Sequence, residues 1–144
     1  MYTEILKQKI IHYYTKYYRD DCSLPNYQEL AEARVNEEQR EKVRMEKLLE
    51  IMPFDFGNTK QFIMGAGTGG LAINLTQEWQ AEVYGNEPNE EALEIIKDKC
   101  KERGIEADHF NNEYGEDLKS ASDNQFDFVH CHTVIEHVAD VRQC

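Results

Sequence analysis

Long apolar segments, proline and basic residues are all scarce in this sequence of 144 residues, which has 3 prolines and 16 basic against 28 acidic residues. The sequence contains no run of about 18 apolar residues, the length needed to cross a bilayer. Glu4, Lys7 and Lys9 interrupt the apolar positions of the N-terminus, which therefore does not resemble a secretory signal. The formal net charge of -12 repels nucleic-acid phosphates and anionic lipids. We therefore expect a cytoplasmic protein with neither nucleic acid nor a membrane as partner.

Paired cysteines are also missing, because no CxxC pair occurs. The four cysteines are Cys22, Cys100, Cys131 and Cys144. Their scatter favours reduced thiols over a disulfide framework or a zinc site. His130 and His132 would share one face of a strand, with His137 a few residues later, but we interpret them as ordinary strand and loop residues. The sequence therefore predicts no metal site.

The first part of the chain, residues 1–55, predicts a pair of helices. One face of residues 3–19 is apolar at helical spacing: Leu6, Ile10, Tyr13, Tyr14 and Tyr17. Pro25 stops this pattern, and a second helix is expected from near Asn26 towards Met52, before Pro53. The expected buried edge of the second helix is Met45, Leu48, Leu49 and Met52. We expect these helices to form an extension that precedes the core.

From residue 56 to 144 the pattern predicts an α/β domain, because short apolar runs alternate with helical segments. Strands are expected at 61–64, 82–87, 107–111 and 126–131. The first crossover helix should turn Leu71, Leu75 and Trp79 towards the sheet. A second should begin after the cap Asn89, bury Leu93, Ile96 and Cys100, and end at Gly104. A further helix should start near Ala139.

A glycine-rich turn lies between the first of these strands and its helix, with the sequence Gly65-Ala66-Gly67-Thr68-Gly69-Gly70. Glycines let the backbone approach a ligand, and the following helix offers free N–H groups. Glu87 ends the next strand, where an acid binds ribose hydroxyls in nucleotide-type sites. This order of residues predicts a cofactor site.

The ordered segments 65–69, 83–88, 126–131 and 135–138 resemble those of class I S-adenosylmethionine-dependent methyltransferases, with an E-H pair as in the type-11 group. The resemblance covers about residues 60–140. It implies a Rossmann-like three-layer sandwich with partial strand order 3-2-1-4, and S-adenosylmethionine lying across the ends of strands one, two and four. It also implies transfer of the methyl group to an acceptor, which we expect to be a small molecule.

The resemblance also implies roles for particular residues. In the family, the glycines lie against the methionine part of the cofactor and the acid matched by Glu87 pairs with the ribose. The resemblance further implies that Glu116 or Asp117 contacts the adenine and that His132 lies beside the methionine end. The full set of cofactor-binding candidates is Gly65, Ala66, Gly67, Thr68, Gly69, Glu87, Pro88, Glu116 and His132. Glu136 and His137 either contact a ligand, or cap the next helix or pack locally. Thr133 lies with His132 beside the methionine end of the cofactor. No residue is assigned as catalytic, because positioning supplies most of the acceleration.

The sequence departs from the family at Ile63, which stands two residues before Gly65 where the family carries an acid that organises the cofactor's amino group. Tyr114 likewise stands where an acid is usual. The tyrosines at 13, 14, 17 and 18 either cover the cofactor or pack on the helix layer, and we favour packing.

Three alternatives remain open. An NAD(P)-binding Rossmann protein also fits Gly65, Gly67, Gly70 and Glu87, although it does not explain residues 126–138. A methyltransferase-like binding module that does not catalyse methyl transfer would explain why Ile63 replaces the family's acid. Finally, a full methyltransferase core has further strands, so we expect a fragment or a truncated product, with a homo-oligomer formed through the open edge of strand four as the other explanation.

Overall fold

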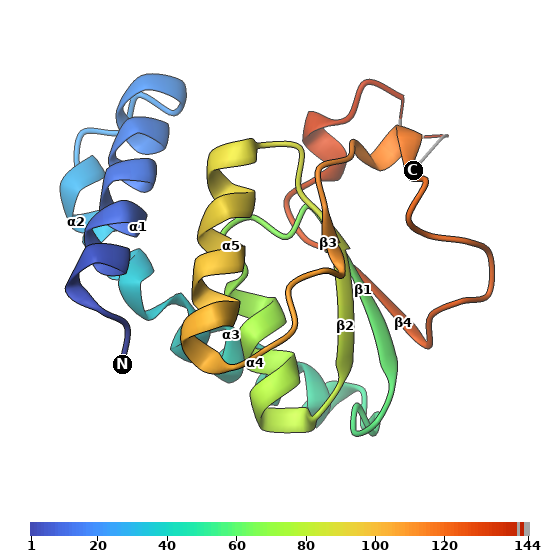
Figure 1. Cartoon of the computed structure of the whole chain (residues 1–144). Coiled ribbons are helices and arrows are strands. Elements are labelled where there is room, and N and C mark those ends of the chain that lie inside the picture. Colours follow the sequence, from blue (N-terminus) through green and yellow to red (C-terminus); the bar gives the residue numbers. More distant parts are fainter. Residues whose placement is uncertain (141, 143–144) are drawn as a thin grey trace.

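The computed structural model describes residues 1–140 and 142, and its centre is a four-stranded parallel sheet in the order β3-β2-β1-β4 (Figure 1). The strands are β1 (Lys60–Met64), β2 (Glu82–Asn86), β3 (Phe110–Asn111) and β4 (Phe128–Cys131). The α/β class, the Rossmann-like sheet and the strand order 3-2-1-4 are confirmed. The third and fourth strands start later than the sequence predicts.

Two crossover helices follow β1 and β2, namely α4 (Gly70–Trp79) and α5 (Glu90–Arg103). The predicted cap is confirmed, because the Asn89 side chain accepts a hydrogen bond from the Ala92 N–H at 3.0 Å, and Gly104 ends the helix with φ 67°. The predicted inward residues are confirmed as well: Leu71, Leu75, Leu93, Ile96 and Cys100 are buried in the core, with Trp79 packed against it. These helices hold the carboxyl ends of β1 and β2 in place.

The N-terminal helices are α1 (Glu4–Lys16), extended by the π-helical turn η1 (Tyr17–Asp21), then α2 (Tyr27–Ala33) and α3 (Glu37–Ile51). The second predicted helix is not continuous, because the 3-10 turn η2 (Arg34–Asn36) divides it into α2 and α3. Asn36 leaves helical geometry there, with φ −111° and ψ 31°, as a weak helix former after the β-branched Val35 can do. The prediction that Met52 is buried is wrong, since 45% of its surface is exposed.

The core has two clusters. Residues of α1, η1 and α2 pack together with Ile95 of α5, whereas Met45 of α3 joins the cluster formed by the sheet, α4 and α5. In Figure 1, α1 lies beside α5, on the side of the sheet that α5 covers, and α2 packs on the other side of α1. The N-terminal helices are therefore attached to the helices that cover the sheet, because α3 packs on α4 and α1 packs on α5.

Short 3-10 turns, η3 (Gly115–Asp117) and η4 (Ile135–His137), lie after β3 and β4. Ala139 is not helical, and the rest of the helix predicted there falls partly on 141 and 143–144, which lie outside the described residues, as does Cys144. Within the described part of the chain, no helix has the length and hydrophobicity needed to cross a membrane.

Candidate functional site

The glycine turn after β1 has the backbone that its sequence predicts. Gly65 and Gly67 have φ values of 64° and 58°, in the left-handed region that glycine adopts without a steric penalty. A Cβ atom on Gly65 would lie 2.5 Å from Val134 Cγ2, but one on Gly67 would have no atom within 4 Å. Gly67 therefore presents bare backbone to open space.

The Glu87 carboxylate lies directly beside this turn. Its Oε2 accepts a hydrogen bond from the Gly67 N–H at 2.7 Å, and its Oε1 accepts one from the Asn89 N–H at 2.9 Å. Only 8% of Glu87 is exposed, and this burial raises the pKa of its carboxyl although the two N–H donors act against the rise. Because a carboxylate has about four acceptor positions, two remain for a ligand.

A cavity of about 550 Å³ opens above the turn, between the carboxyl ends of the strands and the N-terminal helices. This volume is within the usual range for small-molecule sites. The predicted residues that line it are Gly65, Ala66, Gly67, Thr68, Glu87, Pro88, Glu116 and His132. Gly69 is the exception, because it is the N-cap of α4 and a Cβ there would meet Ile96. The structure thus brings all but one of the candidates to one cavity.

The polar candidates differ in what they contact. Thr68 is 1% exposed and its hydroxyl is bonded to Glu37 and, at 3.0 Å, to the Tyr14 hydroxyl. Glu116 is bonded to the Ala139 N–H and lines the cavity, whereas Asp117 does not. His132 lies 2.5 Å from Arg44, between Nδ1 and Nη2.

Around His132, Thr133 and His137 also line the cavity and Glu136 does not. His130, which the sequence places on the same strand face as His132, is instead buried against Gln61, with 2.7 Å between His130 Nε2 and Gln61 Oε1. Burial lowers the pKa of His130 to about 4, so the ring is neutral near pH 7.

The wall of the cavity opposite the strands was not predicted from the sequence. It is formed by α1, η1, η2 and α3, whose residues at the cavity include Tyr13, Tyr14, Tyr17, Arg34, Glu37, Arg40, Glu41 and Arg44. The tyrosines pack as expected, with Tyr14 stacked on Tyr18 at 5.6 Å between ring centroids, and Tyr14 also faces the cavity. The spacing of Glu37, Glu41 and Met45 on one helical face is the signal that could have revealed this wall.

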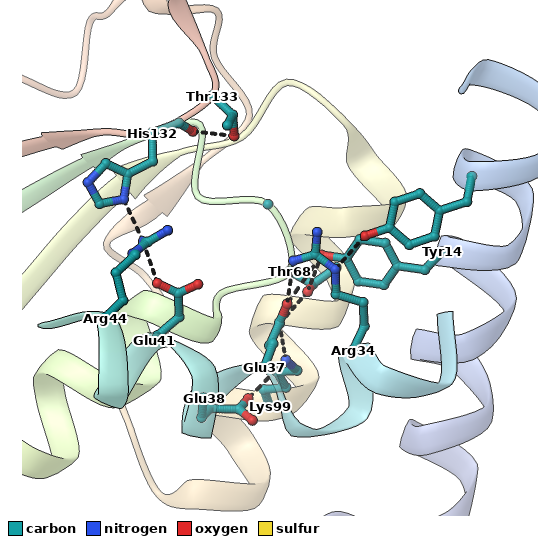
Figure 2. A network of polar contacts seen from close by, with 12 residues as sticks. Tyr14, Arg34, Glu37, Glu38, Glu41, Arg44, Thr68, Lys99, His132 and Thr133 are labelled. Carbon is teal, nitrogen blue, oxygen red and sulfur yellow. Dashed lines mark hydrogen bonds and ion pairs between the residues drawn. The ribbon is translucent and has the colours of Figure 1, made fainter. Parts of the chain in front are cut away.

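A buried network of charges joins the wall to the glycine turn (Figure 2). Glu37 is bonded to Lys99 and to Thr68, and Tyr14 donates to Glu37 Oε2 at 3.2 Å. Burial raises the pKa of Glu37, but the Lys99 ammonium and the other donors outweigh it and hold the pKa below its ordinary value. Lys99 has no exposed surface and also bonds to Glu38 at 2.9 Å. The network therefore fixes α1 and α3 against the site.

Comparison with known proteins places the chain in a family. A model of the methyltransferase domain matches residues 63–144, more than half of the chain. The chain therefore belongs to this family of methyltransferase domains. No curated protein matches the sequence significantly.

Solved structures share the fold. A putative S-adenosyl-L-methionine-dependent methyltransferase from Methanococcus maripaludis is 11% identical with a TM-score of 0.65, and the match covers 99% of this chain and 57% of that one. Magnesium protoporphyrin IX methyltransferase from Synechocystis with bound SAM is 20% identical with a TM-score of 0.58, over 92% and 64% of the two chains. A putative sarcosine dimethylglycine methyltransferase from Galdieria sulphuraria is 16% identical with a TM-score of 0.60, over 95% and 51%.

The chain thus spans less than two thirds of the length of each of these three proteins. At such identities the likeness defines the fold, and the family match carries the assignment. The predicted resemblance to S-adenosylmethionine-dependent methyltransferases is confirmed, and S-adenosylmethionine is the cofactor that the family implies.

Proposed function

We propose that this chain binds S-adenosylmethionine in the cavity above the glycine turn and forms the cofactor-binding part of a methyltransferase for a small-molecule acceptor. The observation that carries the proposal is the position of Glu87. Its carboxylate is fixed by the Gly67 and Asn89 N–H groups, beside bare glycine backbone and with acceptor positions left over. A sugar with two adjacent hydroxyls fits this arrangement, because each carboxylate oxygen can accept one of them.

We assign the roles of the residues around the turn from where they lie in the cavity. The backbone of Gly65, Ala66 and Gly67 would flank the methionine part, Glu87 would hold the ribose, and Glu116 lies at the cavity edge for the adenine. Pro88 would pack beside the ribose, and His132 would lie near the methionine end. The Thr68 hydroxyl is bonded to protein atoms, so its proposed contribution is to the shape of the turn.

Methyl transfer is an in-line displacement in which the acceptor attacks the methyl carbon as its bond to the sulfonium sulfur breaks. The cofactor supplies an activated leaving group, so this chain's residues need mainly to orient the reactants and exclude water. The fixed Glu87 and the rigid turn are suited to that task. We further propose that residues 1–55 form an extension to a core that starts at residue 56, and that the polypeptide is part of a longer protein, which its coverage of the solved structures supports.

The test separates ligand binding from folding with two matched glycine variants. Gly67→Ala and Gly104→Ala both introduce a Cβ at positive φ with no atom within 4 Å, but only Gly67 lines the cavity. Each should lose about 1–2 kcal/mol of folding stability. Calorimetry with S-adenosylhomocysteine should show binding to the natural chain and to Gly104→Ala, and a loss of roughly 10-fold or more in Gly67→Ala, where the methyl group occupies cofactor space.

The same titration with S-adenosylmethionine and with NAD distinguishes the other candidates. Tighter binding of NAD than of either S-adenosyl compound would overturn the proposal in favour of a dinucleotide-binding protein. A folded chain that binds none of the three at millimolar concentration would identify a module that keeps the fold without the cofactor. Equal binding by Gly67→Ala and Gly104→Ala would place the ligand elsewhere.

A further inference from the structure

One buried carboxylate at the cavity has no complete set of partners. Glu37, Glu41 and Met45 follow each other at four-residue spacing on α3 and are its buried residues. Glu41 is 8% exposed and lines the cavity. Its Oε2 is in an ion pair with Arg44, yet no donor is aligned to form a hydrogen bond with that buried oxygen.

The ion pair with Arg44 compensates the charge of this oxygen, but a buried acceptor without an aligned donor still lacks the hydrogen bonds that water would give it. Burial accordingly raises the pKa of Glu41, and the nearby charge of Glu37 adds to the rise, while Arg44 opposes it. A cationic donor placed in the cavity would supply the missing hydrogen bond and keep the carboxylate ionised. Glu41 is thus suited to a positively charged ligand group.

The other acids at the cavity do not offer this. Glu87 accepts from the Gly67 and Asn89 N–H groups, and the proposed function assigns its remaining acceptor positions to the ribose. Glu37 is already bonded to Lys99, Thr68 and Tyr14. Asp21 is exposed and Glu116 is only half-buried, and solvent weakens a charge pair made by such groups. Besides Glu87, which is assigned to the ribose, Glu41 is the buried acid at the cavity, within the described residues, that has a carboxylate oxygen without an aligned donor.

Its location matches one end of the expected ligand. Arg44 contacts Glu41 on one side and His132 on the other, and His132 lies just beyond the last residue of β4 (Figure 2). If Glu87 holds the ribose at the end of β2, the methionine part of the cofactor extends from the sugar towards β1 and β4. It then reaches the part of the cavity where Glu41, Arg44 and His132 lie. Ile63 on β1 also lines the cavity and offers no charge there.

We propose that Glu41 binds the α-ammonium group of the cofactor's methionine part. This inference rests on the proposed function, since it assigns a residue of the N-terminal helices to the same ligand. Glu41 then supplies the negative charge that Ile63 lacks, and the N-terminal helices are part of the cofactor site rather than only a cover for it. An ammonium group would share the carboxylate with Arg44, whose guanidinium also contacts His132.

The experiment compares two ligands on two variants. The ligands are S-adenosylhomocysteine and its deaminated counterpart, which keeps the carboxylate but has no ammonium. Glu41→Gln removes the charge at nearly constant size, and Glu46→Gln makes the same change at an exposed position of α3 that does not line the cavity. Dissociation constants are measured by calorimetry, and thermal unfolding confirms that both variants are folded.

Glu41→Gln should weaken binding of S-adenosylhomocysteine roughly 10- to 100-fold, the range for a hydrogen bond to a charged group, and leave the deaminated ligand nearly unchanged. Glu46→Gln should bind both ligands as the natural chain does. If Glu41→Gln weakens both ligands equally, or neither, the assignment is wrong while cofactor binding stands. If the natural chain binds S-adenosylhomocysteine no better than its deaminated counterpart, the inference fails without any variant, and if it binds neither, the proposed function fails too.

Discussion

The two sides of the cavity are held in place by different kinds of interaction. The floor, which is the glycine turn of residues 65–69 together with Glu87, is fixed by main-chain groups such as the Gly67 N–H on Glu87 and the Ala66 N–H on the Asn86 carbonyl at 2.8 Å. The wall, formed by the cavity residues of α1, η1, η2 and α3, is fixed by buried side-chain charges centred on Glu37 and Lys99. The floor therefore depends on backbone conformation, and the wall on charge pairing.

This difference has a consequence for mutation. A buried ion pair contributes little compared with an apolar pair, but breaking it by removing one partner leaves an uncompensated charge. The floor contains a single buried acid with two backbone donors, so a substitution there changes ligand binding more than folding. Substitutions in the wall should therefore mainly lower the folding stability, and substitutions in the floor should mainly lower the affinity for the ligand.

The largest effect is expected when the wall loses its buried cation. Lys99→Met leaves Arg34 as the cation that pairs with the buried Glu37, 3.8 Å between Nη1 and Oε2, and should lower the free energy of unfolding by about 3–5 kcal/mol. Urea unfolding followed by circular dichroism measures this. Lys97→Met, on the exposed face of the same helix, should change stability by less than about 0.5 kcal/mol. Similar losses in both variants would show that the buried charges do not hold the wall.

The floor and the sheet could be predicted from the sequence because their determinants are close together along the chain. The left-handed turn needs glycine at 65 and 67, and Glu87 follows at the end of the next strand. The N-cap of α5 at Asn89 and the end of α5 at Gly104 likewise depend on residues that are close together in the sequence. The strand order was predicted through the family resemblance, which the match over residues 63–144 confirms.

The wall could not be predicted because its partners are distant in the sequence. Glu37 and Lys99 are 62 residues apart, and Arg44 and His132 are 88 apart. A charged residue in a helix is usually solvated, so the only sign that Glu37 and Glu41 are buried is their four-residue spacing with Met45, which is weak beside the mixed charges of α3. The break at η2, which separates α3 from α2, was missed for a similar reason, since no glycine or proline marks it.

The next largest effect is expected at the floor. Glu87→Gln should weaken binding of S-adenosylhomocysteine by about 1.5–3 kcal/mol, because a neutral amide replaces a charged acceptor for the ribose. The amide nitrogen cannot accept from one of the two backbone N–H groups, so stability should also fall, but by less than in Lys99→Met. Glu90→Gln, an exposed acid on the first turn of α5, is the matched control and should bind normally. Calorimetry at pH 7 tests both. A stability loss in Glu87→Gln as large as that of Lys99→Met would remove the distinction between floor and wall.

The floor should also respond to pH. Burial raises the pKa of Glu87, and the ionised form is the one that accepts two ribose hydroxyls. Affinity should therefore fall on acidification, beginning at a higher pH than the titration of an ordinary glutamate. Glu87→Gln should lack this part of the pH dependence. A natural chain whose affinity stays constant as the pH falls through that range would argue against a ribose contact by Glu87.

The smallest effect is expected where wall and floor meet, at the contact between the Tyr14 and Thr68 hydroxyls. Tyr14→Phe removes this bond and the one to Glu37, and should cost about 1 kcal/mol in unfolding free energy, whereas Tyr13→Phe on the same helix should cost less. Combining Tyr14→Phe with Thr68→Val in a double-mutant cycle gives the coupling between the two sides, expected at about 0.5–1.5 kcal/mol. Additive effects would mean that the wall is held by Lys99 alone. A coupling in this range would mean that the glycine turn and the N-terminal helices form one unit, so that a ligand bound to the floor also stabilises the wall.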